Sequence, residues 1–344
     1  MPSRLIEPEP KAQRMAELMV GLRKTSLVDY PGRIAATLFL PGCNLRCPWC
    51  HNRELVEIEG FATIHNLSVT GAQSPVHQLV RMLAQAPDLP SALPPAPPSD
   101  PQPASALSHA TAKTPALIPL SQALDIMRKR KNILGGVAIT GGEPTLRPEL
   151  PYIVSAIHWL GLEVKLDTNG TLPLSLEKLL LKAETRPDYV AMDLKLAPDR
   201  YRELLPGSML SDCRLDGCSH SFQKFSSRWR NDGEPRTLKQ QEMSDGDLHT
   251  SLGQNLRHSA ELLRQYGIPH EFRTLALPAS FITQKDIVEL AALVDESPWY
   301  FAGFRGGNCL DPQWDLLKEP DPSEVEAFVQ VARALGKHAM VRGM

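Results

Sequence analysis

Residues 32–50 read GRIAATLFLPGCNLRCPWC, an apolar run that passes through a proline and a glycine into three cysteines. The apolar run, residues 32–40, is short and rich in strand-forming residues, which predicts a buried β-strand. Cys43, Cys47 and Cys50 follow with the spacing C-x3-C-x2-C. The stretch therefore predicts a metal- or cluster-binding loop at the carboxyl end of a strand.

The number of cysteines in this loop limits what it can bind. A cubane [4Fe–4S] cluster normally takes four thiolates, and no fourth cysteine stands near Cys50 in the sequence. Three thiolates leave one iron open, and an open iron is a site for chemistry. The alternative is a structural zinc site, which needs four protein ligands. His51 would be the fourth, although its position directly after Cys50 is awkward for two ligands of one tetrahedral ion.

Strand and helix patterns alternate along most of the chain, which predicts a parallel sheet built from βα units. Six strands are readable, so the expected fold class is α/β, an incomplete (β/α)6 TIM-like barrel, and not a closed eight-stranded barrel. The expected strands are residues 32–40, 136–140, 163–166, 189–192, 270–277 and 300–304, and the expected helices are 121–131, 150–160, 176–183, 252–266, 285–294 and 325–335.

The 344 residues suffice for one such domain with a sizeable core. Two stretches interrupt the pattern, and both are expected to loop out of the barrel. One is rich in proline and alanine and the other is polar. The expected organisation is a single domain (1–344) with its core at about 20–60, 120–205 and 252–315, insertions at 61–119 (proline-rich at 87–103) and 208–251, and a C-terminal helix within 321–344.

Composition and charge favour a cytoplasmic protein. The net charge of −2 gives no support to a nucleic-acid or membrane partner, and neither a secretory signal nor a membrane-spanning run is visible. Six cysteines are too few for a disulfide scaffold, which favours a reducing compartment. Cys213, Cys218 and Cys309 have unrelated spacings and are expected to be ordinary free thiols.

Two polar motifs follow consecutive predicted strands. Gly141-Gly142-Glu143-Pro144 lets a ligand approach the backbone closely, although alone it reads as a tight turn. Asp167-Thr168-Asn169-Gly170 follows the next strand. Because ligands of such folds bind at the carboxyl ends of the strands, both motifs are candidates for a binding site.

Charged residues lie at or near the ends of later predicted strands. Asp193-Leu194-Lys195 ends the fourth predicted strand, which places Asp193 beside Asp167. Two close carboxylates repel each other unless a cation neutralises them, although either residue alone could simply cap a turn. Arg273 lies on a later strand, and an arginine inside a barrel needs an anionic partner. That partner is either a ligand or a barrel carboxylate.

Taken in this order, the motifs resemble those of the radical S-adenosylmethionine (SAM) superfamily. The strings TSLVDYPG (25–32) and FLPGCNLRCPWCHN (39–52) narrow the resemblance. They are similar to anaerobic ribonucleoside-triphosphate reductase activating proteins and, more distantly, to pyruvate formate-lyase activating enzyme. The resemblance covers about residues 20–60, 120–205 and 252–315, and the two insertions fall outside it.

The resemblance implies a radical reaction on a protein substrate. Cys43, Cys47 and Cys50 would hold three irons of a [4Fe–4S] cluster, and SAM would bind the fourth. An electron from a flavodoxin- or ferredoxin-type donor would cleave SAM to methionine and a 5′-deoxyadenosyl radical. That radical would remove a hydrogen from one glycine of a partner, a glycyl radical enzyme. The resemblance names anaerobic ribonucleotide reductase as this partner.

The resemblance also assigns roles to the remaining residues. The Gly-Gly-Glu motif would hold the methionine amino group, and Gly142→Val is expected to keep the cluster while weakening SAM binding. Two aspartates and a threonine would hold a monovalent cation beside the SAM carboxylate. The expected SAM contacts are Trp49, His51, Gly141, Gly142, Glu143, Asn169, Lys195 and Arg273, and the expected cation ligands are Asp167, Thr168 and Asp193.

Three alternatives stay open. The chain could act on a small molecule, as 7-carboxy-7-deazaguanine synthase does, although that group lacks the TSLVDYPG lead-in. It could activate a glycyl radical enzyme other than a ribonucleotide reductase, such as one of the pyruvate formate-lyase type. It could also be a zinc-binding protein without enzyme activity.

Overall fold

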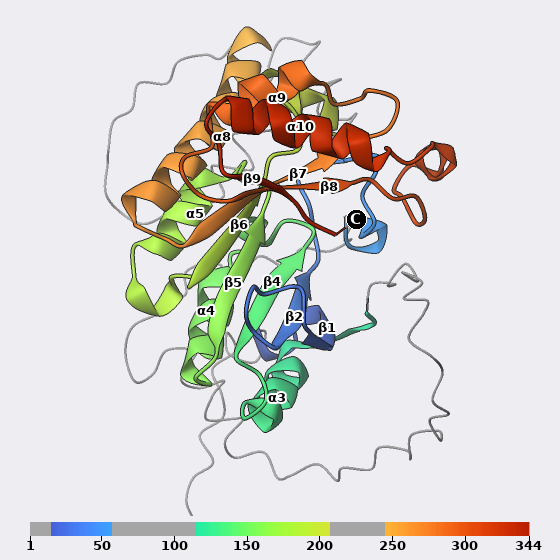
Figure 1. Cartoon of the computed structure of the whole chain (residues 1–344). Helices are drawn as coiled ribbons and strands as arrows, with labels where there is room; N and C mark the ends of the chain where they lie inside the picture. Colours follow the sequence, from blue (N-terminus) through green and yellow to red (C-terminus); the bar gives the residue numbers. More distant parts are fainter. Residues whose placement is uncertain (1–14, 57–114, 207–244, 344) are drawn as a thin grey trace, which may run out of the picture.

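The computed structural model describes residues 15–56, 115–206 and 245–343, and one sheet runs through all three ranges (Figure 1). Most of the two expected insertions, including the proline-rich residues 87–103, lies outside these ranges, as do two of the three isolated cysteines. No helix in the described ranges has the length and apolar character needed to cross a membrane.

The described strands are β1 (Met19–Ser26), β2 (Ala35–Leu40), β3 (Leu117–Pro119), β4 (Gly136–Gly141), β5 (Glu163–Thr168), β6 (Tyr189–Asp193), β7 (His270–Ala276), β8 (Trp299–Gly303) and β9 (Ala339–Val341). Their order in the sheet is β3-β1-β2-β4-β5-β6-β7-β8-β9. From β2 to β9 all neighbours are parallel, whereas β1 runs antiparallel to both β2 and β3. The described α-helices are α3 (Leu120–Arg130), α4 (Leu150–Trp159), α5 (Pro173–Leu180), α8 (Asp245–Gln265), α9 (Gln284–Ala291) and α10 (Pro322–Ala334).

This architecture confirms the predicted fold class. The six expected strands correspond to β2 and to β4 through β8. They are neighbours in the sheet in the same order as in the chain. The two ends of the sheet are different strands, β3 and β9, so the barrel is incomplete. The polar motifs follow β4, β5 and β6, at the carboxyl ends that parallel strands share.

Three strands were not predicted, and two elements extend into the stretches that were expected to be insertions. β1 mixes exposed polar and buried apolar residues without strict alternation, while β3 and β9 have three residues each. β3 lies inside the stretch expected to be an insertion, so residues 117–119 belong to the sheet. α8 begins at Asp245, seven residues before the predicted start of that helix and inside the second expected insertion.

The register of the sheet gathers charged residues on one face. Asp167 pairs with Ala191, and Asp193, two residues further along β6, pairs with Arg273 of β7. Side chains two residues apart on a strand point to the same face. Lys165, Asp167, Asp193 and Arg273 therefore share one face of the sheet, here called the polar face.

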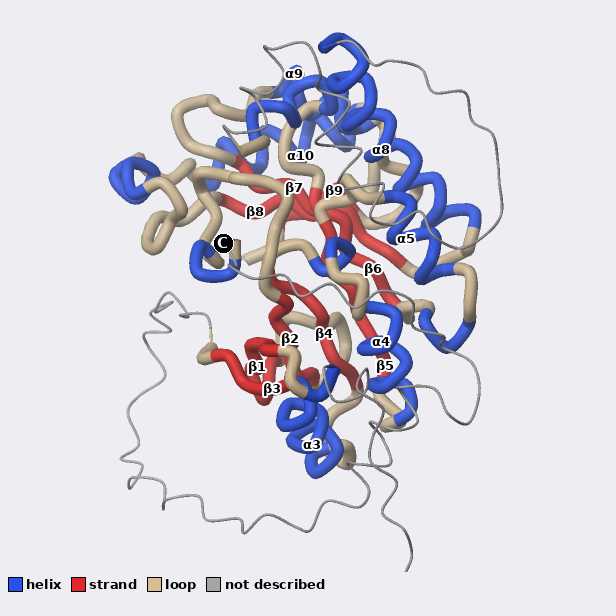
Figure 2. The backbone as a smooth tube through the Cα atoms, turned by 180° about the vertical axis from the view of Figure 1, so that it is seen from behind, coloured by secondary structure: helices blue, strands red, loops and turns tan. Residues whose placement is uncertain are grey.

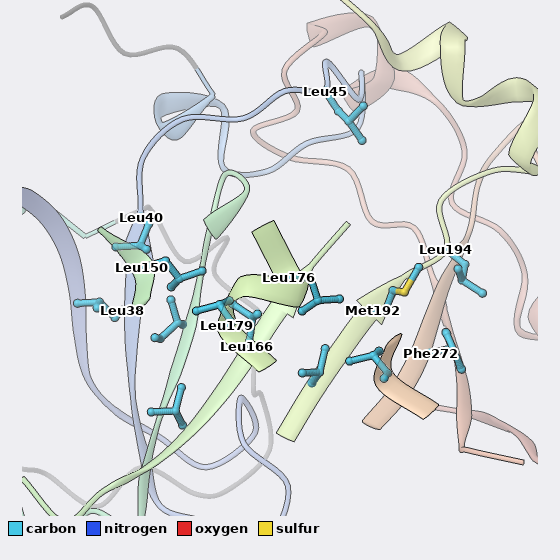
Figure 3. Close-up of a cluster of buried hydrophobic side chains, with 14 of the residues drawn as sticks. Leu38, Leu40, Leu45, Leu150, Leu166, Leu176, Leu179, Met192, Leu194 and Phe272 are labelled. Carbon is cyan, nitrogen blue, oxygen red and sulfur yellow. The ribbon is translucent and has the colours of Figure 1, made fainter. Parts of the chain in front are cut away.

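The opposite face is covered by helices and forms the apolar core. Helices α4, α5 and α8 lie along this side of the sheet (Figures 1 and 2). Each large aliphatic side chain buried here contributes about 1.5–3 kcal/mol, so this layer holds the strands, and with them the loops at their carboxyl ends. Figure 3 shows Leu38, Leu40, Leu166, Met192 and Phe272 of the sheet close to Leu150, Leu176 and Leu179 of the helices.

Candidate cluster and cofactor site

The three-cysteine loop leaves the carboxyl end of β2 and is closed on itself by backbone hydrogen bonds. The amide of Gly42 donates to the carbonyl of Leu55 at 2.7 Å, and the amide of Cys43 donates to that of Val56 at 3.3 Å. Inside the loop, the Cys50 amide donates to the Cys47 carbonyl at 3.0 Å. The loop is thus a compact unit that holds its cysteines at the carboxyl end of β2.

Burial holds the three thiols protonated in the absence of a metal. It raises the pKa of Cys43 to about 11 and that of Cys47 to about 12, and it also raises the pKa of Cys50. The positive charge of Lys195 acts in the opposite direction on all three. Iron binds thiolates, so it has to displace these protons, and its own charge then stabilises the buried anions.

The donor set fits an iron–sulfur cluster better than one zinc ion. Within the described ranges, no three His, Cys, Asp or Glu side chains come together as ligands of a single metal ion. The three thiolates of a cluster bind three separate irons, so they need not converge on one point. His51, the fourth ligand of the zinc alternative, donates instead through Nε2 to the Arg305 carbonyl at 2.8 Å.

The glycines after β4 pack against the cysteine loop. A Cβ on Gly141, whose φ is +129°, would lie 2.2 Å from the Leu40 carbonyl oxygen. A Cβ on Gly142 would lie 2.1 Å from the Gly42 carbonyl oxygen. The Asn52 side chain donates to the Gly141 carbonyl at 3.1 Å. These glycines are therefore required for close contact between two loops, whatever contact they also make with a ligand.

This packing corrects the expectation that Gly142→Val would spare the cluster. The valine side chain would overlap with the carbonyl group of Gly42 and would crowd the Cβ atom of Cys43. We expect the variant to bind about tenfold less iron and sulfide, because overpacking of this kind costs 1–3 kcal/mol or more. Metal analysis after anaerobic loading measures this. Gly303→Ala is the control, since its Cβ would meet only Val325 at 3.6 Å, and a Gly142→Val protein with full loading would contradict the prediction.

Glu143 connects the loops after β4 and β5. Its side chain is 1% exposed. One carboxylate oxygen accepts from the Thr145 amide at 3.0 Å and from the Thr168 hydroxyl at 2.8 Å, and the other accepts from the Asn169 amide at 2.7 Å. Burial raises the pKa of this carboxyl, while the hydrogen bonds lower it. Both oxygens are engaged by the protein's own donors, so Glu143 holds two strand ends together.

Asn169 continues this connection to the cysteine loop. Its Nδ2 donates to the side-chain oxygen of Asn44 at 3.0 Å, and its own oxygen accepts from the Thr171 amide at 3.0 Å. Asn44 in turn donates to the Thr171 hydroxyl at 2.8 Å. Asn44 lies between Cys43 and Leu45, so the end of β5 is tied directly to the cysteine loop. Asn44 was not among the predicted site residues.

Arg273 lies between the two aspartates of the polar face. Its Nε is 2.7 Å from Asp193 Oδ1, and its Nη1 is 3.3 Å from Asp167 Oδ2. Lys195 contacts Asp193 at 3.2 Å, and Lys165 contacts Asp167. Burial would raise the pKa of Asp193, but Arg273 and Lys195 lower it to about 2. Of the two partners considered for Arg273, the structure shows the barrel carboxylates.

The three expected cation ligands are therefore used differently. Asp167 and Asp193 are joined through Arg273, which supplies the positive charge that two close carboxylates require. Thr168 directs its hydroxyl to Glu143. The cation site itself stays a prediction.

Trp49 and His51 both face the C-terminal part of the chain. The Trp49 ring, 7% exposed, lies 5.7 Å from the ring of Phe281 and 5.1 Å from that of Trp314. The exposed His51 lies against the residues that follow β8. Both residues therefore anchor the cysteine loop in this structure, and their expected contact with SAM stays a prediction.

Comparison with known proteins identifies the family. Residues 37–221, more than half of the chain, match the profile of the Radical SAM superfamily. The chain belongs to the radical SAM superfamily. Members of this superfamily use a [4Fe–4S] cluster and SAM, so the protein is a radical SAM enzyme. The assignment of the three thiols after β2 to that cluster stays a prediction.

Three individual proteins are also similar to this chain in sequence. The radical SAM enzyme is 27% identical over 330 residues to a Methanocaldococcus jannaschii protein named as a candidate glycyl-radical enzyme activating enzyme, covering 95% of this chain and 97% of that protein. It is 57% identical over 37 residues to the benzylsuccinate synthase activating enzyme of Thauera aromatica, 11% of each chain. It is also 50% identical over 40 residues to the trans-4-hydroxy-L-proline dehydratase activating enzyme of Clostridioides difficile, 12% of this chain and 13% of that one.

Proposed function

We propose that this radical SAM enzyme is an activating enzyme that generates a glycyl radical on a partner, and that the partner is anaerobic ribonucleoside-triphosphate reductase. The observation that carries the proposal is the similarity to the M. jannaschii protein, which extends over nearly the whole of both chains. The resemblance of the TSLVDYPG string to ribonucleotide reductase activating proteins supports the choice of partner.

Each part of the site has a role in this function. When bound, the cluster and SAM together supply a 5′-deoxyadenosyl radical, which takes a hydrogen atom from the partner's glycine. Cys43, Cys47 and Cys50 hold the cluster, and the charge of Lys195 favours their anionic form. Glu143 and Asn169 hold the ends of β4 and β5 against the cluster loop. Hydrogen-atom abstraction needs no acid or base from the protein.

Arg273 and Lys195 are the proposed partners of the SAM carboxylate. A guanidinium binds a carboxylate through paired donors, and Arg273 already holds two carboxylates on the polar face. If the Arg273 side chain turns to SAM, Asp167 and Asp193 lose the positive charge that neutralises them in part. A monovalent cation at Asp167, Thr168 and Asp193 would restore the charge balance, and this is the basis for proposing it.

The proposal includes a source of electrons and a compartment. Reductive cleavage consumes one electron per SAM, and iron–sulfur clusters of this kind exchange single electrons at low potential. A flavodoxin- or ferredoxin-type protein is the proposed donor. The cytoplasm is the proposed location, since it keeps the cluster thiols reduced.

The experiment is anaerobic incubation of the cluster-loaded protein with SAM, dithionite and one glycyl radical enzyme at a time. Electron paramagnetic resonance (EPR) then reads the glycine-centred doublet. We expect the doublet with anaerobic ribonucleotide reductase, and not with benzylsuccinate synthase or trans-4-hydroxy-L-proline dehydratase. A doublet only with another enzyme would change the partner. Release of 5′-deoxyadenosine without a doublet on any of them would favour a small-molecule substrate, as in 7-carboxy-7-deazaguanine synthase.

A further inference from the structure

The chain between β8 and the end of the following short helix, residues 304–316, lies against the cysteine loop. We call these residues the clamp segment. The amide of Asp311 donates to the Pro48 carbonyl at 2.9 Å. The side chain of Asn308 donates to the His51 carbonyl at 3.1 Å, and the His51 ring donates back to the Arg305 carbonyl at 2.8 Å. The residue two before Cys50 and the residue after it are thus both bonded to this segment.

Aromatic packing holds Trp49, the residue directly before Cys50, against the clamp segment. The ring of Trp314, 9% exposed, lies 5.1 Å from the ring of Trp49 and 5.9 Å from that of Phe304. Phe304 in turn lies 6.3 Å from the His51 ring. Contacts of this geometry add to the burial of large rings. Pro48, Trp49 and His51 therefore all contact the clamp segment.

The clamp segment is itself held in one conformation. One carboxylate oxygen of Asp315 accepts from the amides of Gly307 at 2.8 Å and Cys309 at 3.0 Å. The buried thiol of Cys309 also bonds to Asp315. Asn308 has a φ of +70°, a conformation that asparagine tolerates better than most residues. The segment is therefore an ordered support and not a loosely attached loop.

The other two cluster cysteines are supported differently. The Cys43 amide bonds to Val56 within the loop itself, and the Arg46 amide, just before Cys47, donates to the Leu204 carbonyl at 2.6 Å. Among the described residues, those around Cys50 are bonded to the chain that follows β8. The support of the third ligand is thus separable from that of the first two.

We propose that the clamp segment positions Cys50, with Asn308 and Trp314 as positioning residues, and thereby fixes the orientation of the cluster in its loop. The inference goes beyond the proposed function, because it rests only on Cys43, Cys47 and Cys50 as cluster ligands. A weakened clamp lets the Cys50 ligand detach more often, which exposes its iron to competing chelators. It also changes the symmetry of the ligand field that the cluster electrons experience.

The test uses the full-length, cluster-loaded protein and two readouts that need neither SAM nor a partner enzyme. One is the rate of iron release to an anaerobic ferrous chelator, and the other is the EPR spectrum of the dithionite-reduced cluster. Asn308→Gly keeps the positive φ and removes only the side-chain amide. Asn308→Asp keeps the shape but cannot donate. Leu316→Ala, at a side chain that is 86% exposed, is the matched control from the same segment.

Asn308 Nδ2 donates both to the His51 carbonyl and to the Glu54 carboxylate. We expect Asn308→Gly and Asn308→Asp, which lose both hydrogen bonds, to release iron about fivefold faster than wild type, and Trp314→Leu at least about tenfold faster. All three should show shifted EPR g values, whereas Leu316→Ala should match wild type. Release rates and spectra of Asn308→Gly that equal those of wild type would overturn the proposal. Absence of a glycyl radical would count against the proposed function alone, since neither readout involves it.

Discussion

Replacing Cys47 with alanine is expected to remove both the cluster and SAM cleavage. Cys47 is the most buried of the three cysteines, at 7% exposed, and burial raises its pKa to about 12. Its loss leaves two cysteines for a site that needs three. Mutation of a residue that only hydrogen-bonds to a metal ligand typically lowers metal affinity or activity 10–100-fold. Loss of a ligand itself should therefore lower 5′-deoxyadenosine formation to below about one-hundredth of wild type.

Iron and sulfide content and chromatography of the SAM products measure this effect. Cys213→Ser is the control, because it removes a thiol of the same chain that has no place in the three-cysteine spacing. We expect the control to load and cleave as wild type does. A Cys47→Ala protein that still cleaved SAM at the wild-type rate would show that the ligand set is wrong.

Replacing Arg273 with glutamine is expected to have the second-largest effect. The change removes the charge between Asp167 and Asp193 and, in the proposed function, the partner of the SAM carboxylate. Truncating one side of a charged pair that is removed from water costs about 2–5 kcal/mol, so the Kd for SAM should rise by about 30-fold or more. Equilibrium binding to the loaded protein measures it, with Arg264→Gln on the surface of α8 as the control. An unchanged Kd would remove Arg273 from the SAM site.

The same variant should alter the response of stability to acid. Arg273 and Lys195 lower the pKa of Asp193 to about 2, well below its value of about 3.9 in an unfolded chain. This ionised carboxylate stabilises the fold fully above about pH 4, and that contribution is lost as the pH falls toward 2. Without Arg273 the pKa of Asp193 rises, so the variant should lose less stability than wild type between these pH values. Urea unfolding at pH 6 and pH 3 compares the two proteins, and equal losses would contradict the assignment.

The parallel part of the fold was predictable from local patterns. β2, β4, β5, β6 and β8 end at or just before glycine, asparagine or aspartate residues, and the helices between the strands have clear periodicity. β1 carries Arg23, Lys24 and Thr25 beside buried Val20 and Leu22, because it lies near the edge of the sheet. A strand in that position alternates poorly, and three-residue strands such as β9 leave almost no pattern to read.

The site was predictable where the chain itself carries the spacing. The three cysteines and the Gly-Gly-Glu motif were recognised from adjacent residues. The connection of Glu143 to Thr168 and Asn169, and the contact of Trp49 with Trp314, join residues far apart in sequence. Such contacts depend on the register of the sheet and on the path of the chain after β8. No local signal in the sequence reports either, and this is why the clamp segment was not predicted.

The most direct test of the account is the fate of SAM on the oxygen-free protein loaded with iron and sulfide. After addition of dithionite, the account predicts that the wild-type protein releases 5′-deoxyadenosine and methionine in equal amounts, and that Cys47→Ala releases neither above background. Fully loaded wild-type protein that binds SAM, accepts an electron and leaves the sulfonium intact would contradict it.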